Sequence, residues 1–407
     1  MCLMITSAVY SQNKSIVRMG STDTRSFDED WLFSRYGLQP DGSRIEEPRG
    51  LESQSQIDSN WQKLNLPHDW AITGPFRSDL TGETGKLPWK GIGWYRKHFT
   101  VPAADAGKQI FVDFDGAMAY AKIWLNGKYI GTWPYGYNSF RMDLTPYIKP
   151  GQENILAVRL DTESWDSRWY PGGGIYRHVW LVKTDPVHVG HWGTYITTPK
   201  ITDKNALVKL SVTVDNATNK KIKASVRTTL FELDIKNKPK TKVAVTKEIL
   251  VEVNPGASKE TTSETKITNP KLWDIKSPNR YVAQTSISIN GKIVDTYNTP
   301  FGIRTIEFTA KNGFLLNGKK VVIKGTCNHH DLGALGAAIN TSALKRQLKM
   351  LQEIGCNSLR TSHNPPAPEL LELADQMGFL VWDEAFDTWK VGKKKNDYNK
   401  IFDEWHE

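Results

Sequence analysis

Three segments near the C-terminus decide the fold: Val321–Asp331 (VVIKGTCNHHD), Asn357–Pro365 (NSLRTSHNP) and Phe379–Trp389 (FLVWDEAFDTW). Each begins with apolar residues typical of a buried strand and ends in polar residues. Helical patterns separate the three segments, which predicts parallel strands joined by helices, as in a (β/α) barrel. Loops that follow the strands of such a barrel form its active-site face, so these polar residues are candidate active-site residues.

The two intervening helices are predicted from the spacing of their leucines. Thr341 or Ser342 is expected to be the N-cap of the first helix, and Gly355 is expected to end it. Its apolar face is predicted to contain Leu344, Leu348, Leu351 and Ile354. The second helix is expected from about Pro368 to Met377. Because the sequence ends at Glu407, residues 304–407 are expected to form only the first three units of a barrel.

The preceding residues are predicted to form two β domains. Short alternating segments between residues 28 and 186, separated by turn signals such as Asn126-Gly127, favour a jelly-roll sandwich. Residues 187–303 contain a further set of short strands rich in Lys and Thr, which favours an immunoglobulin-like sandwich. Residues 1–27 are assigned to neither domain and form an N-terminal segment.

The composition excludes several classes of protein. Hydrophobic residues make up 39% and charged residues 24% of the 407 residues, as in ordinary globular proteins. No segment reaches the roughly 18 apolar residues that a membrane span needs. The net charge of +9 is dispersed except at Lys390 and Lys393–Lys395, where a solvated surface is expected rather than a nucleic-acid site. Three cysteines are too few for a disulfide framework or a structural zinc site.

The first residues, MCLMITSAVYSQ, resemble the end of a secretory signal peptide, because the apolar run Cys2–Tyr10 is followed by small residues. The basic residues that usually begin such a signal are missing. A start codon placed too late explains this pattern, and a hydrophobic tail is the alternative. The first explanation predicts a periplasmic or secreted protein.

The strand ends supply candidate binding residues. Alternation along a strand places His329 and Asp331 on one side and His330 on the other, which suits a polar ligand, a metal or a structural role. Two prolines stiffen the turn after His363, which favours binding of a hydroxyl-rich substrate. The alternative is that Arg360 and His363 tie neighbouring loops together.

Asp383 and Glu384 are adjacent on a predicted strand, so they cannot both face one site. We expect one of them to line the pocket and the other to anchor a neighbouring strand. Two loops of the first domain also combine charged and aromatic residues, and ordinary surface loops are the alternative for both. These loops are Leu66–Trp70 (LPHDW) and Arg168–Gly174 (RWYPGGG).

Blocks throughout the chain resemble glycoside hydrolase family 2 and occur in the order of its jelly-roll, immunoglobulin-like and TIM-barrel domains. The blocks are PHDW, GWYRKHF, AKIWLNGKYIG, WYPGGGIYRHVWL, FGIRTIEF, IKGTCNHHD, LRTSHNPP and VWDEAF. Within the family the chain looks most like the β-galactosidases, whose architecture β-glucuronidases and β-mannosidases share. The resemblance implies a retaining exo-β-glycosidase that acts on β-linked oligosaccharides or glycosides in carbohydrate degradation.

The resemblance also implies roles for individual residues. The family's acid/base and nucleophile glutamates follow barrel strands 4 and 7, beyond Glu407, so no catalytic residue and no turnover are expected of these residues alone. Substrate contacts are expected from the four matched positions and from three strand-end residues. The matched positions are Asp69, Asp161, His329 and His363, and the strand-end residues are Arg360, Asp383 and Glu384.

Some β-galactosidases bind Mg²⁺ through an acid four residues past the glutamate of the DEA motif. That position is Thr388 here, so neither a metal nor another cofactor is expected. The His-His-Asp sequence at residues 329–331 also departs from the commoner His-Glu pair of the family. A full-length form is a possible homo-oligomer by analogy with the family.

Two other functions are compatible with the sequence. A non-catalytic carbohydrate-binding protein made of two β-sandwiches is the first, although such a protein does not need barrel strands with polar ends. A gene fragment without function is the second. DNA sequence downstream of codon 407 that encodes an in-frame Asn-Glu pair would favour the enzyme.

Overall fold

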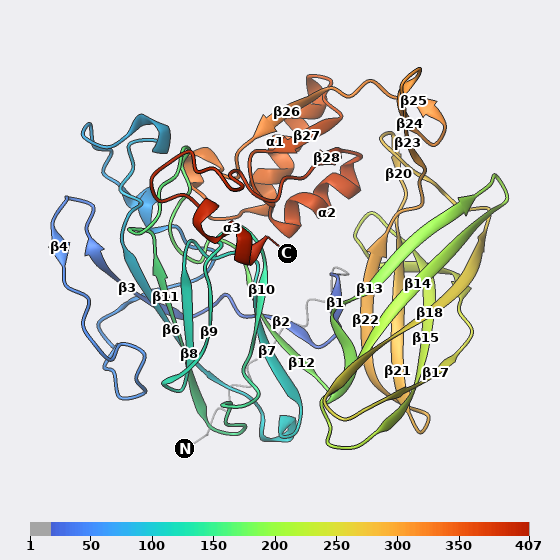
Figure 1. The fold of residues 1–407 in the computed structure, drawn as a ribbon, viewed down its shortest axis with the longest axis horizontal. Helices are drawn as coiled ribbons and strands as arrows, with labels where there is room; N and C mark the ends of the chain where they lie inside the picture. The colour runs from blue at the N-terminus through green and yellow to red at the C-terminus, as the bar shows by residue number, and fades with distance from the viewer. Residues whose placement is uncertain (1–17, 407) are drawn as a thin grey trace, which may run out of the picture.

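The computed structural model describes residues 18–406, which form two β-sandwich units and a smaller α/β unit (Figure 1). The segment MCLMITSAVYSQ, predicted to be a signal-peptide remnant, lies outside the described residues. Within the described part of the chain, no helix is long and apolar enough to cross a membrane.

The first unit is a jelly-roll sandwich of two antiparallel sheets. Its larger sheet contains β3 (Trp31–Leu38), β4 (Arg44–Ile45), β5 (Gln62–Leu64), β6 (Ile92–Thr100), β8 (Ala121–Leu125), β9 (Lys128–Trp133) and β11 (Glu153–Asp161). These strands pair in the order β4-β3-β6-β11-β8-β9, and β5 pairs with β3. The smaller sheet contains β2 (Thr24–Ser26), β7 (Gln109–Phe114), β10 (Phe140–Asp143) and β12 (Val179–Thr184). Its order is β10-β7-β12-β2.

Alternation along these strands fills the space between the two sheets with apolar side chains. On β7, Ile110, Val112 and Phe114 are fully buried, whereas the residues between them are partly exposed. Because successive side chains of a strand face opposite ways, this pattern gives one buried and one wetter face. Tryptophans take up much of the remaining volume, and Trp31 and Trp165 are among the largest fully buried side chains.

The hairpin predicted at Asn126-Gly127 is confirmed. It joins β8 to β9, which pair antiparallel. Asn126 has a φ of 53° and Gly127 a φ of 76°. Two successive positive φ values are typical of the type I′ turn, whose twist matches that of the flanking strands.

The second unit is an immunoglobulin-like sandwich. One sheet contains β13 (Val187–Ile201), β14 (Asn205–Asn216) and β18 (Ala257–Thr268), paired in that order. The other contains β1 (Gly20–Ser21), β15 (Ile222–Leu233), β16 (Pro239–Val245), β17 (Ile249–Val253), β21 (Tyr281–Ile289) and β22 (Lys292–Phe301). Its order is β1-β22-β21-β15-β16, with β17 paired to β15. No pattern in the sequence predicted that β1, from the N-terminal segment, would pair with β22.

The third unit is the beginning of a TIM barrel. Its parallel strands are β26 (Gly325–Asn328), β27 (Ser358–Thr361) and β28 (Leu380–Trp382), in that order. They alternate with α1 (Thr341–Glu353) and α2 (Pro368–Met377), and α3 (Asn399–Trp405) follows. Five short strands join the unit to the second sandwich: β19 (Trp273–Asp274), β20 (Ser277–Pro278), β23 (Ile306–Thr309), β24 (Gly313–Leu316) and β25 (Lys319–Lys320). The predicted alternation of strand and helix is therefore confirmed.

Two details of the predicted helices need correction. Asn340, not Thr341 or Ser342, caps α1, because its side-chain oxygen accepts a hydrogen bond from the Ala343 N–H at 2.9 Å. Ile354 lies just beyond the helix and is 74% exposed, so it does not extend the apolar face. The second helix has its predicted bounds, and Gly378 ends it with a φ of 80°.

Candidate active site

Two histidines from different barrel loops meet over one tryptophan of the first sandwich. His329 follows β26, His363 follows β27, and their ring centroids lie 5.7 Å apart. Trp169 stacks on His329 at 5.2 Å and meets the edge of His363 at 5.5 Å. Trp169 is only 7% exposed, so it packs against the two imidazoles from the protein interior and does not face solvent. The structure thus brings together two residues that the sequence predicted to bind substrate.

Hydrogen bonds fix the orientation of both imidazole rings. His329 Nδ1 lies 3.0 Å from the carbonyl oxygen of Ser362, which only accepts, so Nδ1 carries the proton. His363 Nδ1 lies 3.1 Å from Oε2 of Glu384, which only accepts, and 3.3 Å from Nη2 of Arg360, which only donates. We assign the proton to Nδ1 on the shorter contact, that with the carboxylate. Within the described residues, neither Nε2 atom has a hydrogen-bond partner. With one proton on each ring, placed on Nδ1, Nε2 is the nitrogen that can accept a hydrogen bond.

Glu384 is the centre of an ion-pair network. Arg360 donates from Nε to Oε1 of Glu384 at 2.8 Å, and its Nη2 lies 2.6 Å from the same oxygen. The other carboxylate oxygen accepts a hydrogen bond from His363 Nδ1. Glu384 is therefore already paired on both oxygens, and its role in this arrangement is to position Arg360 and His363.

Asp383 makes different contacts from Glu384, and both residues lie just after β28 (Leu380–Trp382) and not on it. Its Oδ1 accepts a bond of 3.4 Å from the hydroxyl of Thr361. Burial raises the pKa of Asp383, and the Thr361 hydrogen bond opposes this shift. Thr361 also accepts a bond from the Glu384 N–H at 3.2 Å, so it ties the end of β28 to β27. Asp383 thus belongs to the strand anchor and Glu384 to the histidine cluster.

A second ion pair borders the cluster. Arg168 contacts Asp387 at 2.6 Å, and Lys393 contacts the same carboxylate at 2.9 Å. Burial alone would raise the pKa of Asp387, but the hydrogen bonds from the two cations outweigh it and lower the pKa. Lys394 pairs with Glu83 of the first sandwich at 2.6 Å. The lysine run predicted to be a solvated surface is therefore partly an interdomain contact, because nearby carboxylates attract it.

Asp69 was predicted to contact sugar, but the structure uses both of its oxygens internally. Oδ1 accepts from the N–H groups of Ala71 at 3.0 Å and Gly173 at 3.1 Å. Oδ2 accepts from the Tyr170 hydroxyl at 2.6 Å and the Ala337 N–H at 2.8 Å. The carboxylate is only 2% exposed in this arrangement, and its predicted contact with a sugar stays a prediction. Asp69 holds the loop after Trp169 against the barrel loop that contains Ala337.

Asp161 is also absent from the histidine cluster. It ends β11, and its carboxylate accepts hydrogen bonds from the N–H groups of Glu163 at 2.9 Å and Ser164 at 3.3 Å. Arg159 lies 3.3 Å from its other oxygen. These partners are all within three residues, so Asp161 stabilises its own turn. Its predicted contact with substrate stays a prediction.

Two buried residues that the sequence did not single out for a role hold the barrel loops in place. Arg177 donates to the carbonyl oxygens of Pro365 at 2.9 Å and Pro366 at 3.2 Å, which fixes the turn after His363. It also donates to the carbonyl of Tyr137 at 2.6 Å. His330 donates from Nε2 to the carbonyl of Pro171 at 3.0 Å, facing away from His329 as strand alternation predicts. Burial, with the charge of Arg177, lowers the pKa of His330 to about 3.

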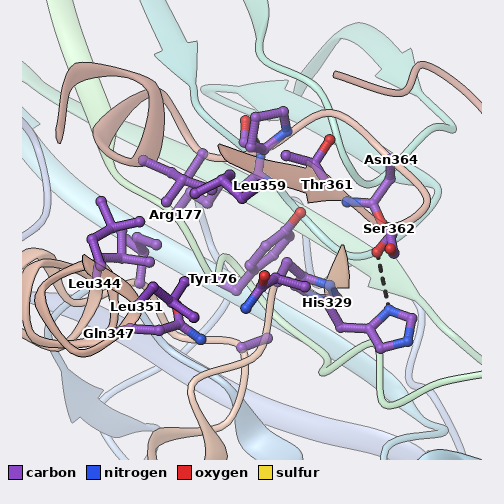
Figure 2. Close-up of a pocket in the computed structure, with 18 residues that line it drawn as sticks. Tyr176, Arg177, His329, Leu344, Gln347, Leu351, Leu359, Thr361, Ser362 and Asn364 are labelled. Carbon is purple, nitrogen blue, oxygen red and sulfur yellow. Dashed lines mark hydrogen bonds between the residues drawn. The ribbon is translucent and has the colours of Figure 1, made fainter. Parts of the chain in front are cut away.

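A small cavity lies behind the cluster, between α1 and the first sandwich (Figure 2). Leu344 and Leu351 of α1 form one side and Leu359 of β27 another, while Tyr176 lies between them. The space open to water in it is about 30 Å³, where one water molecule needs about 10–15 Å³. The cavity is therefore part of the hydrophobic core beneath the site and is too small for a sugar.

The metal alternative for residues 329–331 finds no support in the geometry. His329 and His330 bind different carbonyl groups, and the Asp331 carboxylate lies 3.4 Å from the N–H of Gly333 in its own loop. Residues 18–406 contain no group of three or more His, Cys, Asp or Glu side chains placed to hold a metal ion. Thr388 is buried and donates to Asp397 at 3.2 Å.

Comparison with known proteins shows that the chain belongs to glycoside hydrolase family 2. Three domain models of this family match the chain in order. The sugar binding domain matches residues 51–185, the domain described as Glycosyl hydrolases family 2 matches residues 187–304, and the TIM barrel domain matches residues 306–406. The chain is 45% identical over 384 residues to the β-galactosidase BoGH2A of Bacteroides ovatus. The match covers 94% of this chain and 43% of that protein, so the chain spans less than half the length of this relative.

Solved structures agree with this assignment. A family 2 glycosyl hydrolase from Bacteroides cellulosilyticus superposes with a TM-score of 0.86 at 39% identity, covering 94% of this chain and 48% of the other. A β-glucuronidase of the same family superposes with a TM-score of 0.83 at 26% identity, covering 94% and 41%. The relatives therefore include enzymes named for two different sugars.

Proposed function

We propose that this chain provides the sugar-recognition part of a retaining exo-β-glycosidase whose substrates are β-galactosides. The observation that carries the proposal is the pair of imidazoles from His329 and His363. Each presents an acceptor nitrogen beside the other, and a sugar hydroxyl can donate to either. Arg360 is partly exposed next to them and can donate to a hydroxyl oxygen.

The charge balance at this site favours a neutral sugar over a glucuronide. Arg360 is paired with Glu384, and Arg168 and Lys393 are both paired with Asp387. A glucuronate carboxylate only accepts hydrogen bonds, so it would meet two acceptor nitrogens and no unpaired cation among these residues. A galactose hydroxyl both donates and accepts. The β-glucuronidases among the relatives make the glucuronide the alternative substrate.

Cleavage with retention needs two carboxylates about 5 Å apart that flank the bond. Glu384 is paired with Arg360 and His363, and Asp69 is saturated with hydrogen bonds, so neither is free for this chemistry. We therefore propose that residues 1–407 recognise the sugar without turning it over. A non-catalytic carbohydrate-binding protein is the alternative for the chain as a whole. On the resemblance of residues 1–12 to a signal peptide, we propose a periplasmic or secreted location.

Binding measurements distinguish the two sugars. Isothermal titration of the chain at pH 7.5 should show tighter binding of methyl β-galactoside than of methyl β-glucuronide. His329→Ala and His363→Ala should each weaken galactoside binding about fivefold, since one hydrogen bond contributes roughly 1 kcal/mol. Lys395→Ala, at an exposed position of the same loop system, is the matched control. Preference for the glucuronide would overturn the proposed sugar. If both histidine variants bind methyl β-galactoside as tightly as the unmodified chain does, the sugar does not bind at the histidine cluster.

A further inference from the structure

A cavity lies between the second sandwich and helix α2 of the barrel unit. The space open to water in it is about 150 Å³. Because one water molecule needs about 10–15 Å³ of such space, the cavity has room for a molecule of roughly ten non-hydrogen atoms. None of the residues that line it belongs to the histidine cluster. The cavity is therefore a separate place in the molecule.

Direct contacts between the two units hold the walls of the cavity. Trp273, which is 2% exposed, donates from Nε1 to the backbone carbonyl of Asp375 in α2 at 2.8 Å. Figure 1 shows α2 beside β20, the short strand that follows this tryptophan. At the end of α2, a Cβ on Gly378 would collide with the carbonyl oxygen of Ile275, so helix and strand pack closely. The shape of the cavity thus comes from packed elements.

Two arginines line the cavity on the side of the second sandwich. Arg280 donates to the backbone carbonyl of Asp234 at 3.3 Å and to the side-chain oxygen of Asn237. The guanidinium of Arg304 lies over the ring of Trp273, 4.6 Å from its centroid. In the part of the chain that the structure describes, no carboxylate forms an ion pair with either arginine. Both cations are therefore available to an anionic group in the cavity.

Two carboxylates of α2 line the same cavity. Glu372 and Asp375 are three residues apart, which places them on one face of the helix. Within residues 18–406, neither carboxylate accepts a hydrogen bond. Burial raises the pKa of Glu372 to about 7, and the nearby Glu369 adds to this shift. Burial also lowers the pKa of Arg304. Such shifts are expected for charges that are removed from water without a close partner.

The arrangement of these charges indicates what the cavity can bind. A charge that is taken out of water is unfavourable unless a group of opposite charge pairs with it. A simple anion would pair with the arginines but would also meet two carboxylates, and a simple cation would meet two arginines. A molecule with a carboxylate at one end and an ammonium group at the other complements both sets. The other lining residues include Leu233, Pro300 and Phe301, which suit an apolar side chain.

We propose that this cavity binds a small zwitterion of the α-amino acid class with a short apolar side chain. The ligand's carboxylate accepts hydrogen bonds from Arg280 and Arg304, and its ammonium group donates to Asp375 and Glu372. Because such a ligand contacts both units, its binding stabilises the docking of α2 on the second sandwich. This site goes beyond the proposed sugar recognition and does not depend on it.

The test compares three molecules of similar size on the 407-residue chain at pH 7.5. L-Valine has both charges, 2-hydroxyisovalerate lacks the ammonium group, and isobutylamine lacks the carboxylate. L-Valine should raise the melting temperature in a dose-dependent way, because a ligand that binds only the folded chain stabilises it. Each analogue should need at least about tenfold higher concentration for the same increase, since it loses the hydrogen bonds of one charged group.

Arg304→Gln removes one charge from the cavity and should abolish the effect of L-valine. Arg346→Gln, at an exposed position of α1, is the matched control and should leave the effect unchanged. Circular dichroism shows whether each variant is folded. A crystal of the unmodified chain soaked with L-valine gives a measurement that does not depend on variants, and the amino acid is expected between Arg304 and Asp375.

Three results would overturn the proposal. The first is an effect of L-valine no larger than that of both analogues, the second is an effect that persists in folded Arg304→Gln, and the third is a cavity without the amino acid in the soaked crystal. Titration with methyl β-galactoside is a separate measurement, so each of these results leaves the proposed function standing.

Discussion

Replacing Asp69 by Asn should destabilise the first sandwich by about 2–3 kcal/mol. An asparagine side chain has one acceptor oxygen, which can keep the bonds to Ala71 and Gly173. Its NH₂ group then faces the Ala337 N–H at the 2.8 Å position of Oδ2, donor against donor. The cost combines one buried unsatisfied N–H, worth about 1–3 kcal/mol, with the loss of charge from the remaining bonds.

Differential scanning calorimetry measures this effect. For a unit of roughly 150–250 residues, each 1 kcal/mol changes the melting temperature by about 2–4 °C, so a decrease of about 4–12 °C is expected. Asp30→Asn is the matched control, because Asp30 is exposed and its carboxylate only forms a surface ion pair with Lys63. That change should remain within about 1 kcal/mol.

A sugar-binding measurement completes the test. An unchanged melting temperature together with a large loss of galactoside affinity would refute the reasoning from the structure. It would show that Asp69 contacts the sugar directly, as the sequence had predicted. A lower melting temperature, with the galactoside affinity at 25 °C unchanged, would support the structural role.

Three further predictions concern the chain as a whole. The 407-residue chain should release no aryl group from aryl β-galactosides, because the family resemblance implies that the two catalytic glutamates follow barrel strands 4 and 7; steady enzyme-dependent release would contradict this. Burial lowers the pKa of His330 to about 3, so the unfolded chain binds a proton below about pH 6.5 that the folded chain does not, and stability is lost as pH falls. Between pH 7 and pH 5, the contribution of His330 to the free energy of unfolding should fall by about 2 kcal/mol. Thermal unfolding of His330→Asn at the two pH values should lack this decrease. Limited proteolysis should digest the α/β unit and leave a core that ends near residues 302–308, since Val322 and Trp382 are 65% and 61% exposed; equal resistance beyond Phe308 would contradict it.

Local patterns in the sequence were sufficient to predict most elements. The order of strand and helix from Gly325 to Trp382 follows from apolar periodicity, and the hairpin at Asn126-Gly127 follows from the need for two positive φ values. The start of α1 was misplaced by one residue, because Asn, Thr and Ser at positions 340–342 can all cap a helix and only the backbone conformation distinguishes them.

The site was predicted less completely, because its contacts join residues far apart in the sequence. His329 and His363 were found, since each follows its own strand. The role of Trp169 as their support depends on packing between two units. Asp69 and Ala337 are separated by 268 positions, and no local pattern shows that a buried carboxylate will be saturated there. Arg177 was inconspicuous for the same reason, because its partners are backbone carbonyls of another unit.

A crystal structure of the 407-residue chain soaked with isopropyl β-thiogalactoside, which resists hydrolysis, tests the central claim most directly. The galactose ring is expected beside His329, His363 and Arg360, with hydroxyl groups within about 3.2 Å of the two Nε2 atoms. Galactoside density at any other place, with these two nitrogens free of ligand at saturating concentration, would contradict the claim.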